Sequence, residues 1–299
     1  MVFAAIDIGS NAVRLLVSNV YEDGRKTYFN KFSLTRVPIR LGEDAFLNGK
    51  ISLEKVIALV KAMTAFKHLM EIYRPIEYLA YATSAMRNAK NAQNIVGEIE
   101  KHTGIKVSII DGQKEAEIIY STHVADEMTK SLSYLYIEVG GGSIELSLFS
   151  RVKNIFSRSF PIGTVRMLHN LVRKSEWQEI KHWLQVNTAE YHPLVAIGTG
   201  GNINCILKML RKKEGRPFSV KKVLEMHEFL SSYSLDDRIK ILGLRPDRAD
   251  VILPALEIYL SIMKWTDISK IIVPKIGLAD GMIHLLYEKY KLSKKAGER

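Results

Sequence analysis

A chain of 299 residues is long for one domain and suits two. Of these residues 47% are hydrophobic and 25% are charged, a composition that excludes a largely disordered chain. No apolar run approaches the roughly 20 residues that cross a bilayer, and the chain opens on the strand-like VFAAIDI, so we expect a cytoplasmic protein with no membrane partner. The net charge of +11 favours an anionic partner, with plain solubility as the alternative. The basic residues are scattered and no nucleic-acid-binding motif is visible, so we expect no nucleic acid partner.

Cysteine and histidine give no sign of a disulfide or a zinc site. The single Cys205 lies in NINCILKML, an apolar helix face, where a small buried side chain is expected. None of the eight histidines pairs with another at a metal-binding spacing. A metal in this protein should therefore be a hard cation bound by carboxylates.

The first half of the chain predicts strands followed by alternating helices and strands. FAAIDIGSNAVRLLVSNV indicates strand, tight turn and strand, with Asp7 ending the first strand and residues 9–11 in the turn; KTYFNKFSL is a third strand. The stretch SLEKVIALVKAMTAFKHLMEIY has apolar residues three and four apart, which predicts a helix that stops before Pro75. IEYLAYA and IKVSII are short buried strands, each followed by a helix that begins near Thr83 or Gln113.

The second half repeats this plan. LYIEVGGGSIELSLF indicates strand, glycine turn and strand, with Glu138 before the turn and Glu145 after it. VKNIFSRSF, PLVAIG and KIIVP supply the later strands. The repeat predicts two α/β domains with mixed sheets in the order βββαβαβα and a cleft between them. We expect the domains to cover residues 1–127 and 128–299, with a helical insertion over about 203–265 in the second.

Three glycine-rich turns, DIGSN, GGGS and GTGGN, are candidates for binding phosphate. Glycines allow positive φ angles and let backbone N–H groups approach an anion, although an ordinary tight turn is the alternative for each. A carboxylate beside a bound phosphate is repulsive unless a cation lies between them, so Asp7, Glu138 and Glu145 are candidate Mg²⁺ ligands. The candidate substrate-binding residues of the turns are Gly9, Ser10, Asn11, Gly140, Gly141, Gly142, Ser143, Gly198, Gly200 and Gly201.

Seven segments resemble, in the same order, the motifs of the exopolyphosphatase and guanosine pentaphosphate phosphatase (Ppx/GppA) family. They are DIGSNAVRLLV, YATSAMRNAKN, DGQKEAEIIY, EVGGGSIELS, FPIGTVRML, AIGTGGN and LRPDRADVILP. The resemblance covers nearly the whole chain and implies the short, two-domain form with duplicated actin-like (ribonuclease H-like) domains. It also implies magnesium-dependent hydrolysis of the terminal phosphate of inorganic polyphosphate, or of guanosine pentaphosphate, with water as the nucleophile.

The resemblance assigns roles to two further residues. Glu115, in the motif that reads GQKEA here, is expected to be the general base or water-orienting group, with Glu117 as the second choice. Lys114 replaces a glutamate of that motif and adds a positive charge beside the base. Arg87 in TSAMRNAKN matches an arginine that binds phosphate, a role that suits the forked guanidinium group.

This sequence departs from the family pattern near the proposed site. Glu138 stands where aspartate is usual, Ile144 where threonine is usual, and Ala12 and Ala279 replace a serine and an arginine. Weak catalysis or a different substrate would explain these departures, so a non-catalytic sensor of polyphosphate or guanosine polyphosphates stays open as an alternative. The chain ends before the helical domains of longer members, which favours short polyphosphate chains, a homodimer that completes the channel, or another substrate. A kinase of the same superfamily would need an adenosine pocket, for which we see no signature.

Overall fold

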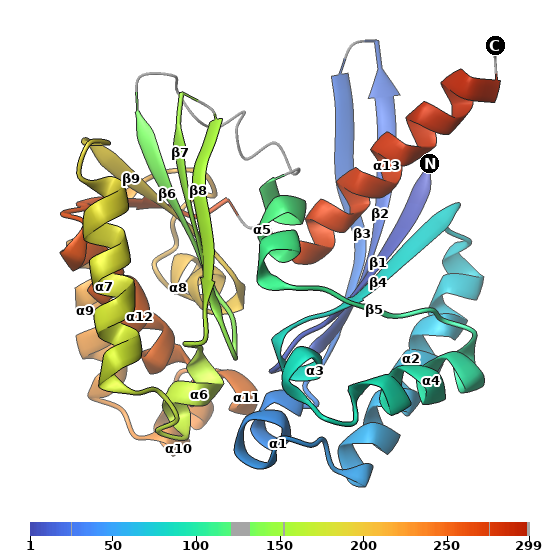
Figure 1. Ribbon diagram of the computed structural model, residues 1–299, viewed down its shortest axis with the longest axis horizontal. Helices are drawn as coiled ribbons and strands as arrows, with labels where there is room; N and C mark the ends of the chain where they lie inside the picture. Colours follow the sequence, from blue (N-terminus) through green and yellow to red (C-terminus); the bar gives the residue numbers. More distant parts are fainter. Residues whose placement is uncertain (25, 121–131, 152, 275, 298–299) are drawn as a thin grey trace. The chain divides into compact units, whose positions relative to one another are not determined.

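The computed structural model describes residues 1–24, 26–120, 132–151, 153–274 and 276–297. It forms two compact units, Met1–Thr122 with Gly277–Arg299, and His123–Ile276. Each unit is an α/β structure built on one mixed sheet, which confirms the predicted fold class (Figure 1). The predicted boundary at residues 127 and 128 and the cleft are not described by the structure.

The sheet of unit 1 has the strand order β3-β2-β1-β4-β5. Strand β1 pairs antiparallel with β2 and parallel with β4, so the sheet is mixed, as predicted. The strand predicted from IKVSII is reduced to two residues, because only Tyr81 and Ala82 of β4 pair with it. The strands are β1 (Val2–Ile8), β2 (Val13–Asp23), β3 (Lys26–Val37), β4 (Glu77–Ala82) and β5 (Ser108–Ile109).

The long helix predicted in the first half, α2 (Leu53–Tyr73), begins after a capping serine and ends just before the proline that was expected to stop it. Ser52 caps the N-terminus by accepting a hydrogen bond from the Lys55 backbone N–H, and Arg74, in the left-handed conformation, ends the helix just before Pro75. The helices of unit 1 are α1 (Leu41–Asn48), α2 (Leu53–Tyr73), α3 (Ser84–Asn88), α4 (Ala92–Thr103), α5 (Gly112–Tyr120) and α13 (Leu278–Gly297).

The last helix differs from the sequence-based division, which placed residues 277–299 in the second domain. Helix α13 packs against β1, β2, β4 and α5 of unit 1 (Figure 1). A Cβ atom built on Gly281 would lie 2.1 Å from the Ile118 carbonyl oxygen, so α13 and α5 approach as closely as glycine allows.

The sheet of unit 2 has the order β10-β11-β9-β6-β7-β8, which repeats that of unit 1 and adds β10, a strand the sequence did not predict. Helices α8 to α12 lie between β9 and β11, together with β10. The strands are β6 (Ser133–Val139), β7 (Ile144–Ser150), β8 (Lys153–Phe160), β9 (Leu194–Thr199), β10 (Phe218–Ser219) and β11 (Lys270–Ile272). The helices are α6 (Thr164–Leu168), α7 (Lys174–Thr188), α8 (Gly201–Met209), α9 (Val220–Ser231), α10 (Leu235–Lys240), α11 (Pro246–Ala249) and α12 (Ile252–Trp265).

Each sheet sends alternate side chains to opposite faces, and this alternation separates the core from the candidate site. In unit 1, Ala4, Ile6 and Ile8 join the main apolar core with α2 and α4, while Asp7 points to the other face. In unit 2, Leu135, Ile137 and Val139 join the core, and Glu138 points away from it. Among the described helices, none combines the length and apolar character needed to cross a bilayer.

Candidate functional site

The first turn closes β1 and β2 over residues 9–12. The Gly9 N–H donates to the Ala12 carbonyl at 3.1 Å. The carbonyls of Ser10 and Asn11 accept hydrogen bonds from the backbone N–H groups of Gly42 and Arg40 at the start of α1. The Gly9 N–H is thus used inside the turn, and the start of α1 engages two of the turn's carbonyl groups.

The second turn, residues 140–143, is closed by the equivalent hydrogen bond. The Gly140 N–H donates to the Ser143 carbonyl at 3.0 Å, and the Gly140 and Gly141 carbonyls accept from Thr164 and Val165 at the start of α6. The Arg166 Nε donates to the Gly142 carbonyl at 2.8 Å. The closing hydrogen bond is thus the same in the two turns, whereas the backbone N–H groups of the helix start contact the second and third carbonyls of the first turn and the first and second carbonyls of the second turn.

Gly163 sets how closely α6 approaches the second turn. A Cβ at this position would lie 2.5 Å from backbone atoms of Gly141 and Gly142. Such a distance is impossible without movement of the backbone, so the position requires glycine. Sequence reasoning did not single out Gly163, although the residue lies in the FPIGTVRML segment.

Of the three predicted metal-binding acids, Asp7 and Glu138 occupy equivalent positions in the two sheets. Asp7 is directly opposite Arg14 across β1 and β2, and the Arg14 Nη1 lies 2.6 Å from the Asp7 Oδ2. Glu138 is directly opposite Glu145 across β6 and β7. Opposed residues project on the same face of a sheet, so the turn of unit 1 is flanked by an ion pair and that of unit 2 by two carboxylates.

Hydroxyl groups hold both carboxylates of unit 2. The Glu145 Oε1 accepts hydrogen bonds from the Ser143 hydroxyl at 2.7 Å and the Ser159 hydroxyl at 3.0 Å. Glu138 accepts a longer bond, 3.4 Å, from the Tyr136 hydroxyl, which also contacts the Thr199 hydroxyl at 2.5 Å. Burial, and next the charge of Glu138, raise the pKa of Tyr136 well above its ordinary value, so the phenol stays protonated.

These carboxylates fit a magnesium ion better in unit 2 than in unit 1. Mg²⁺ is commonly bound through one or two carboxylates together with substrate phosphates and water, which matches the Glu138 and Glu145 pair. The Asp7 Oδ2 is engaged by Arg14, so a cation would have to use its other oxygen or a bridging water. Within the described ranges no group of three or more His, Cys, Asp or Glu side chains is gathered for a metal.

Glu115 lies in the first turn of α5, which Asp111 begins by accepting a hydrogen bond from the Lys114 N–H at 2.7 Å. Its side chain is buried, and the Arg87 Nη1 lies 4.0 Å from the Glu115 Oε2. The same nitrogen donates to the Ile110 carbonyl at 2.6 Å. The structure thus brings together the predicted base and the predicted phosphate-binding arginine.

Lys114 and Glu117 form a pair of their own. The Lys114 Nζ lies 3.3 Å from the Glu117 Oε2, and both side chains are about half exposed. The positive group adjacent to Glu115 is therefore Arg87, whereas Lys114 pairs with Glu117 on the exposed side of α5. This arrangement favours Glu115 over Glu117 as the candidate base.

The third glycine turn joins β9 to α8. Gly200 has φ +101°, and a Cβ there would lie 3.1 Å from the Val139 carbonyl oxygen. A Cβ on Gly198 would lie 2.8 Å from the Ile271 Cδ1, so this glycine has a packing role that is independent of any ligand. The Arg248 Nη1 donates to the Gly201 carbonyl and to the Asn202 Oδ1, which places a guanidinium group at the start of α8.

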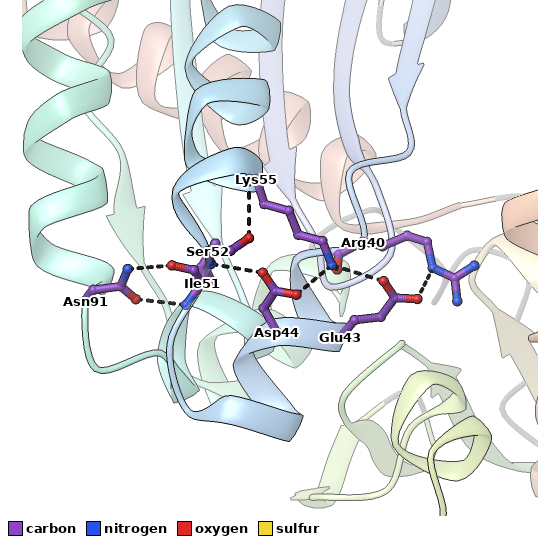
Figure 2. A network of polar contacts seen from close by, with 7 residues as sticks. All are labelled: Arg40, Glu43, Asp44, Ile51, Ser52, Lys55 and Asn91. Atoms are coloured by element: carbon purple, nitrogen blue, oxygen red, sulfur yellow. Dashed lines mark hydrogen bonds and ion pairs between the residues drawn. The ribbon is translucent and has the colours of Figure 1, made fainter.

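A cavity of about 570 Å³ lies elsewhere in unit 1, between the start of α2 and α4. Its lining includes Ile51, Ser52 and Asn91, and it contains none of the predicted site residues. Figure 2 shows the neighbouring polar network, in which the Asn91 side chain bonds both backbone groups of Ile51. The predicted site residues therefore lie outside this cavity.

Comparison with known proteins places the chain among phosphatases. A model of the Ppx/GppA phosphatase family matches residues 20–289. Exopolyphosphatase 1 of Mycobacterium tuberculosis is 23% identical over 303 residues, which cover 95% of this chain and 87% of that protein. A guanosine-5'-triphosphate,3'-diphosphate pyrophosphatase of Pseudoalteromonas translucida is 23% identical over 295 residues, 94% of this chain and 57% of that one. The crystal structure of an exopolyphosphatase from Cytophaga hutchinsonii has a TM-score of 0.84 at 21% identity, over 97% of this chain and 98% of that chain, and shares its fold.

Proposed function

This chain belongs to the Ppx/GppA phosphatase family, and we propose that it is an exopolyphosphatase, a hydrolase that releases the terminal phosphate of inorganic polyphosphate. The observation that carries the proposal is the pair of buried carboxylates, Glu138 and Glu145, beside the turn of residues 140–143. Two acids next to backbone N–H groups that suit a phosphate make chemical sense when a divalent cation joins them. A cytoplasmic setting belongs to the same proposal.

The roles of the residues follow from their chemistry. Glu138 and Glu145, with Asp7, would hold Mg²⁺, which when bound neutralises phosphate charge and polarises the bond to be broken. Arg87 would bind the terminal phosphate, and Glu115 would accept a proton from the attacking water. The phosphate chain would be bound by the turn residues Gly9, Ser10, Asn11, Gly140, Gly141, Gly142, Ser143, Gly198, Gly200 and Gly201.

The reaction is a transfer of the terminal phosphoryl group to water. The water oxygen attacks the terminal phosphorus, and the bond between that phosphorus and the bridging oxygen breaks. The bridging oxygen leaves with its electron pair as the new end of the chain. Glu115 takes the proton that the water loses, and orthophosphate is released.

Two glutamates on α5 give a matched test of the base. Purified protein with Mg²⁺ and short-chain polyphosphate should release orthophosphate, and Glu115→Gln should lower the rate at least 100-fold with the fold intact. Glu117→Gln, which removes an exposed carboxylate two residues away, should leave the rate within about twofold. The reverse pattern would transfer the base to Glu117, and no release by wild type from any polyphosphate would refute the proposed activity.

Guanosine pentaphosphate hydrolysis is the second candidate, favoured by the likeness to the Pseudoalteromonas protein. It would use the same phosphate-binding groups and differ in a purine site. Comparing kcat/KM for the two substrates at one Mg²⁺ concentration decides between them. Binding of either compound by wild type without release of phosphate would instead identify a sensor.

A further inference from the structure

A chain of hydroxyl groups ends on the Glu138 carboxylate. The Tyr136 hydroxyl lies 2.5 Å from the Thr199 hydroxyl and donates to the Glu138 Oε2 at 3.4 Å. A phenol has one proton, so when Tyr136 donates to Glu138 the short contact is a hydrogen bond donated by Thr199. The direction of the chain is therefore from Thr199 through Tyr136 to Glu138.

This chain of hydroxyls is enclosed and anchored. Tyr136 is 4% and Thr199 1% exposed, and Glu138 itself is 9% exposed. The Tyr259 hydroxyl on α12 donates to the Thr199 carbonyl at 2.6 Å, and the Ile137 carbonyl oxygen lies 3.2 Å from the same hydroxyl. The neighbouring strands β6 and β9 thus hold Thr199 and Tyr136 in fixed positions.

We propose that Tyr136, held by Thr199, is a positioning residue that orients the Glu138 carboxylate for the bound magnesium ion. The inference rests on the proposed function, in which Glu138 is a metal ligand. Tyr136 and Glu138 are two residues apart on β6, so their side chains project from the same face of the sheet.

A positioning group is needed because the glutamate side chain is flexible and the metal has strict geometric requirements. A glutamate side chain has three torsion angles, and Mg²⁺ requires a nearly ideal octahedral arrangement at short distances. Glu145 is fixed by the two hydroxyls of Ser143 and Ser159 on one oxygen. Tyr136 gives the opposite carboxylate a donor as well, at the longer distance of 3.4 Å.

The test measures metal binding without substrate, so that it does not depend on turnover. Mn²⁺ and Mg²⁺ are titrated into the full chain by calorimetry, with wild type, Tyr136→Phe, Thr199→Val and Thr199→Ser compared. We expect Tyr136→Phe and Thr199→Val to raise the Kd about 3- to 10-fold, and Thr199→Ser, which keeps the hydroxyl, to stay near wild type.

Tyr134→Phe is the matched control, because it removes the hydroxyl of another buried tyrosine on β6. Its Kd should equal that of wild type, and melting temperatures show whether each variant is folded. An unchanged Kd in Tyr136→Phe, or a Kd raised equally by Tyr134→Phe, would overturn the inference. So would a wild-type chain that binds neither ion.

Phosphate release is measured separately on the same samples. Wild type that binds Mn²⁺ but releases no phosphate refutes the exopolyphosphatase proposal, while the order of the Kd values still decides the role of Tyr136. An active wild type with identical Kd values for all variants refutes only the role of Tyr136.

Discussion

Glu138 lies directly opposite Glu145 across β6 and β7. Like charges at opposed positions of a sheet repel each other, and burial strengthens the effect. At the equivalent place in unit 1, Arg14 faces Asp7 and the repulsion is replaced by an ion pair. This asymmetry supports the proposal that a cation is bound beside the second turn.

Neutralising one glutamate of the Glu138 and Glu145 pair should affect the stability of the protein and its use of Mg²⁺ in opposite directions. Glu145→Gln keeps the shape and removes a charge, so we expect the melting temperature to stay the same or rise while phosphate release falls at least tenfold and needs more Mg²⁺. Titrating Mg²⁺ in the release assay measures both effects. Glu179→Gln, an exposed site on α7, is the control, and equal Mg²⁺ curves for the two variants would contradict the metal assignment.

Gly163 offers a steric test of the second turn. A Cβ there would press on Gly141 and Gly142, so Gly163→Ala should cost about 1–3 kcal/mol of unfolding free energy and lower phosphate release at least tenfold. Denaturant unfolding and the release assay provide the two numbers.

Gly97→Ala is the matched control for that substitution. Gly97 is exposed within α4 and a Cβ there meets no atom within 4 Å, so alanine should stabilise the helix by about 0.5–1 kcal/mol. If Gly163→Ala changed the unfolding free energy and phosphate release no more than Gly97→Ala does, the close approach of α6 to the turn would not be needed for activity.

Much of this arrangement follows from local sequence pattern. The sequence predicted a strand on each side of the glycine turn, with Glu138 before it and Glu145 after it, and the pairing of these strands places the two glutamates on one face. The same reasoning applied to the first turn would have placed Arg14 opposite Asp7, but that register was not worked out from the sequence. Helix α2 was predictable because its cap and its stop signal are both local.

Relationships between distant segments were not predictable in this way. Tyr136 contacts Thr199 because β6 pairs in parallel with β9. The register of a parallel pair cannot be predicted from the sequence of either strand alone. The apolar face of helix α13 could pack on either sheet, so the sequence of the helix does not predict that it packs against β1 in unit 1. Tertiary packing decides both.

The packing of α13 on α5 should matter for the candidate base. Gly281→Ala would place a methyl group against the Ile118 carbonyl, on the helix that carries Glu115. We expect a loss of about 3 kcal/mol or more in unfolding free energy and a fall in kcat larger than the change in KM. Gly277→Ala, where a Cβ meets no atom within 4 Å, should be nearly neutral, and equal effects of the two would refute the contact.

The network of Figure 2 predicts how acid weakens unit 1. The Lys55 Nζ contacts the Arg40 carbonyl, Glu43 and Asp44, and the Arg40 N–H in turn donates to the Asn11 carbonyl of the first turn. Burial alone would raise the pKa of Asp44, but hydrogen bonds from Ser52 and Lys55 outweigh it and lower the pKa below its ordinary 3.8. The folded chain therefore binds this proton less readily than the unfolded chain. Its contribution to stability is complete above about pH 4 and is lost as pH falls through the folded pKa.

Asp44→Asn removes this contribution and should cost about 1 kcal/mol at neutral pH. The difference from wild type should be constant above about pH 4 and shrink as the pH falls below it, because protonation then removes the same charge from wild type. Unfolding free energies measured above and below that pH check the slope. Asp236→Asn, in an exposed pair with Lys240, should cost less than about 0.5 kcal/mol throughout, since exposed ion pairs contribute little. A difference between wild type and Asp44→Asn that grew toward low pH would reverse the sign and refute this role for Asp44.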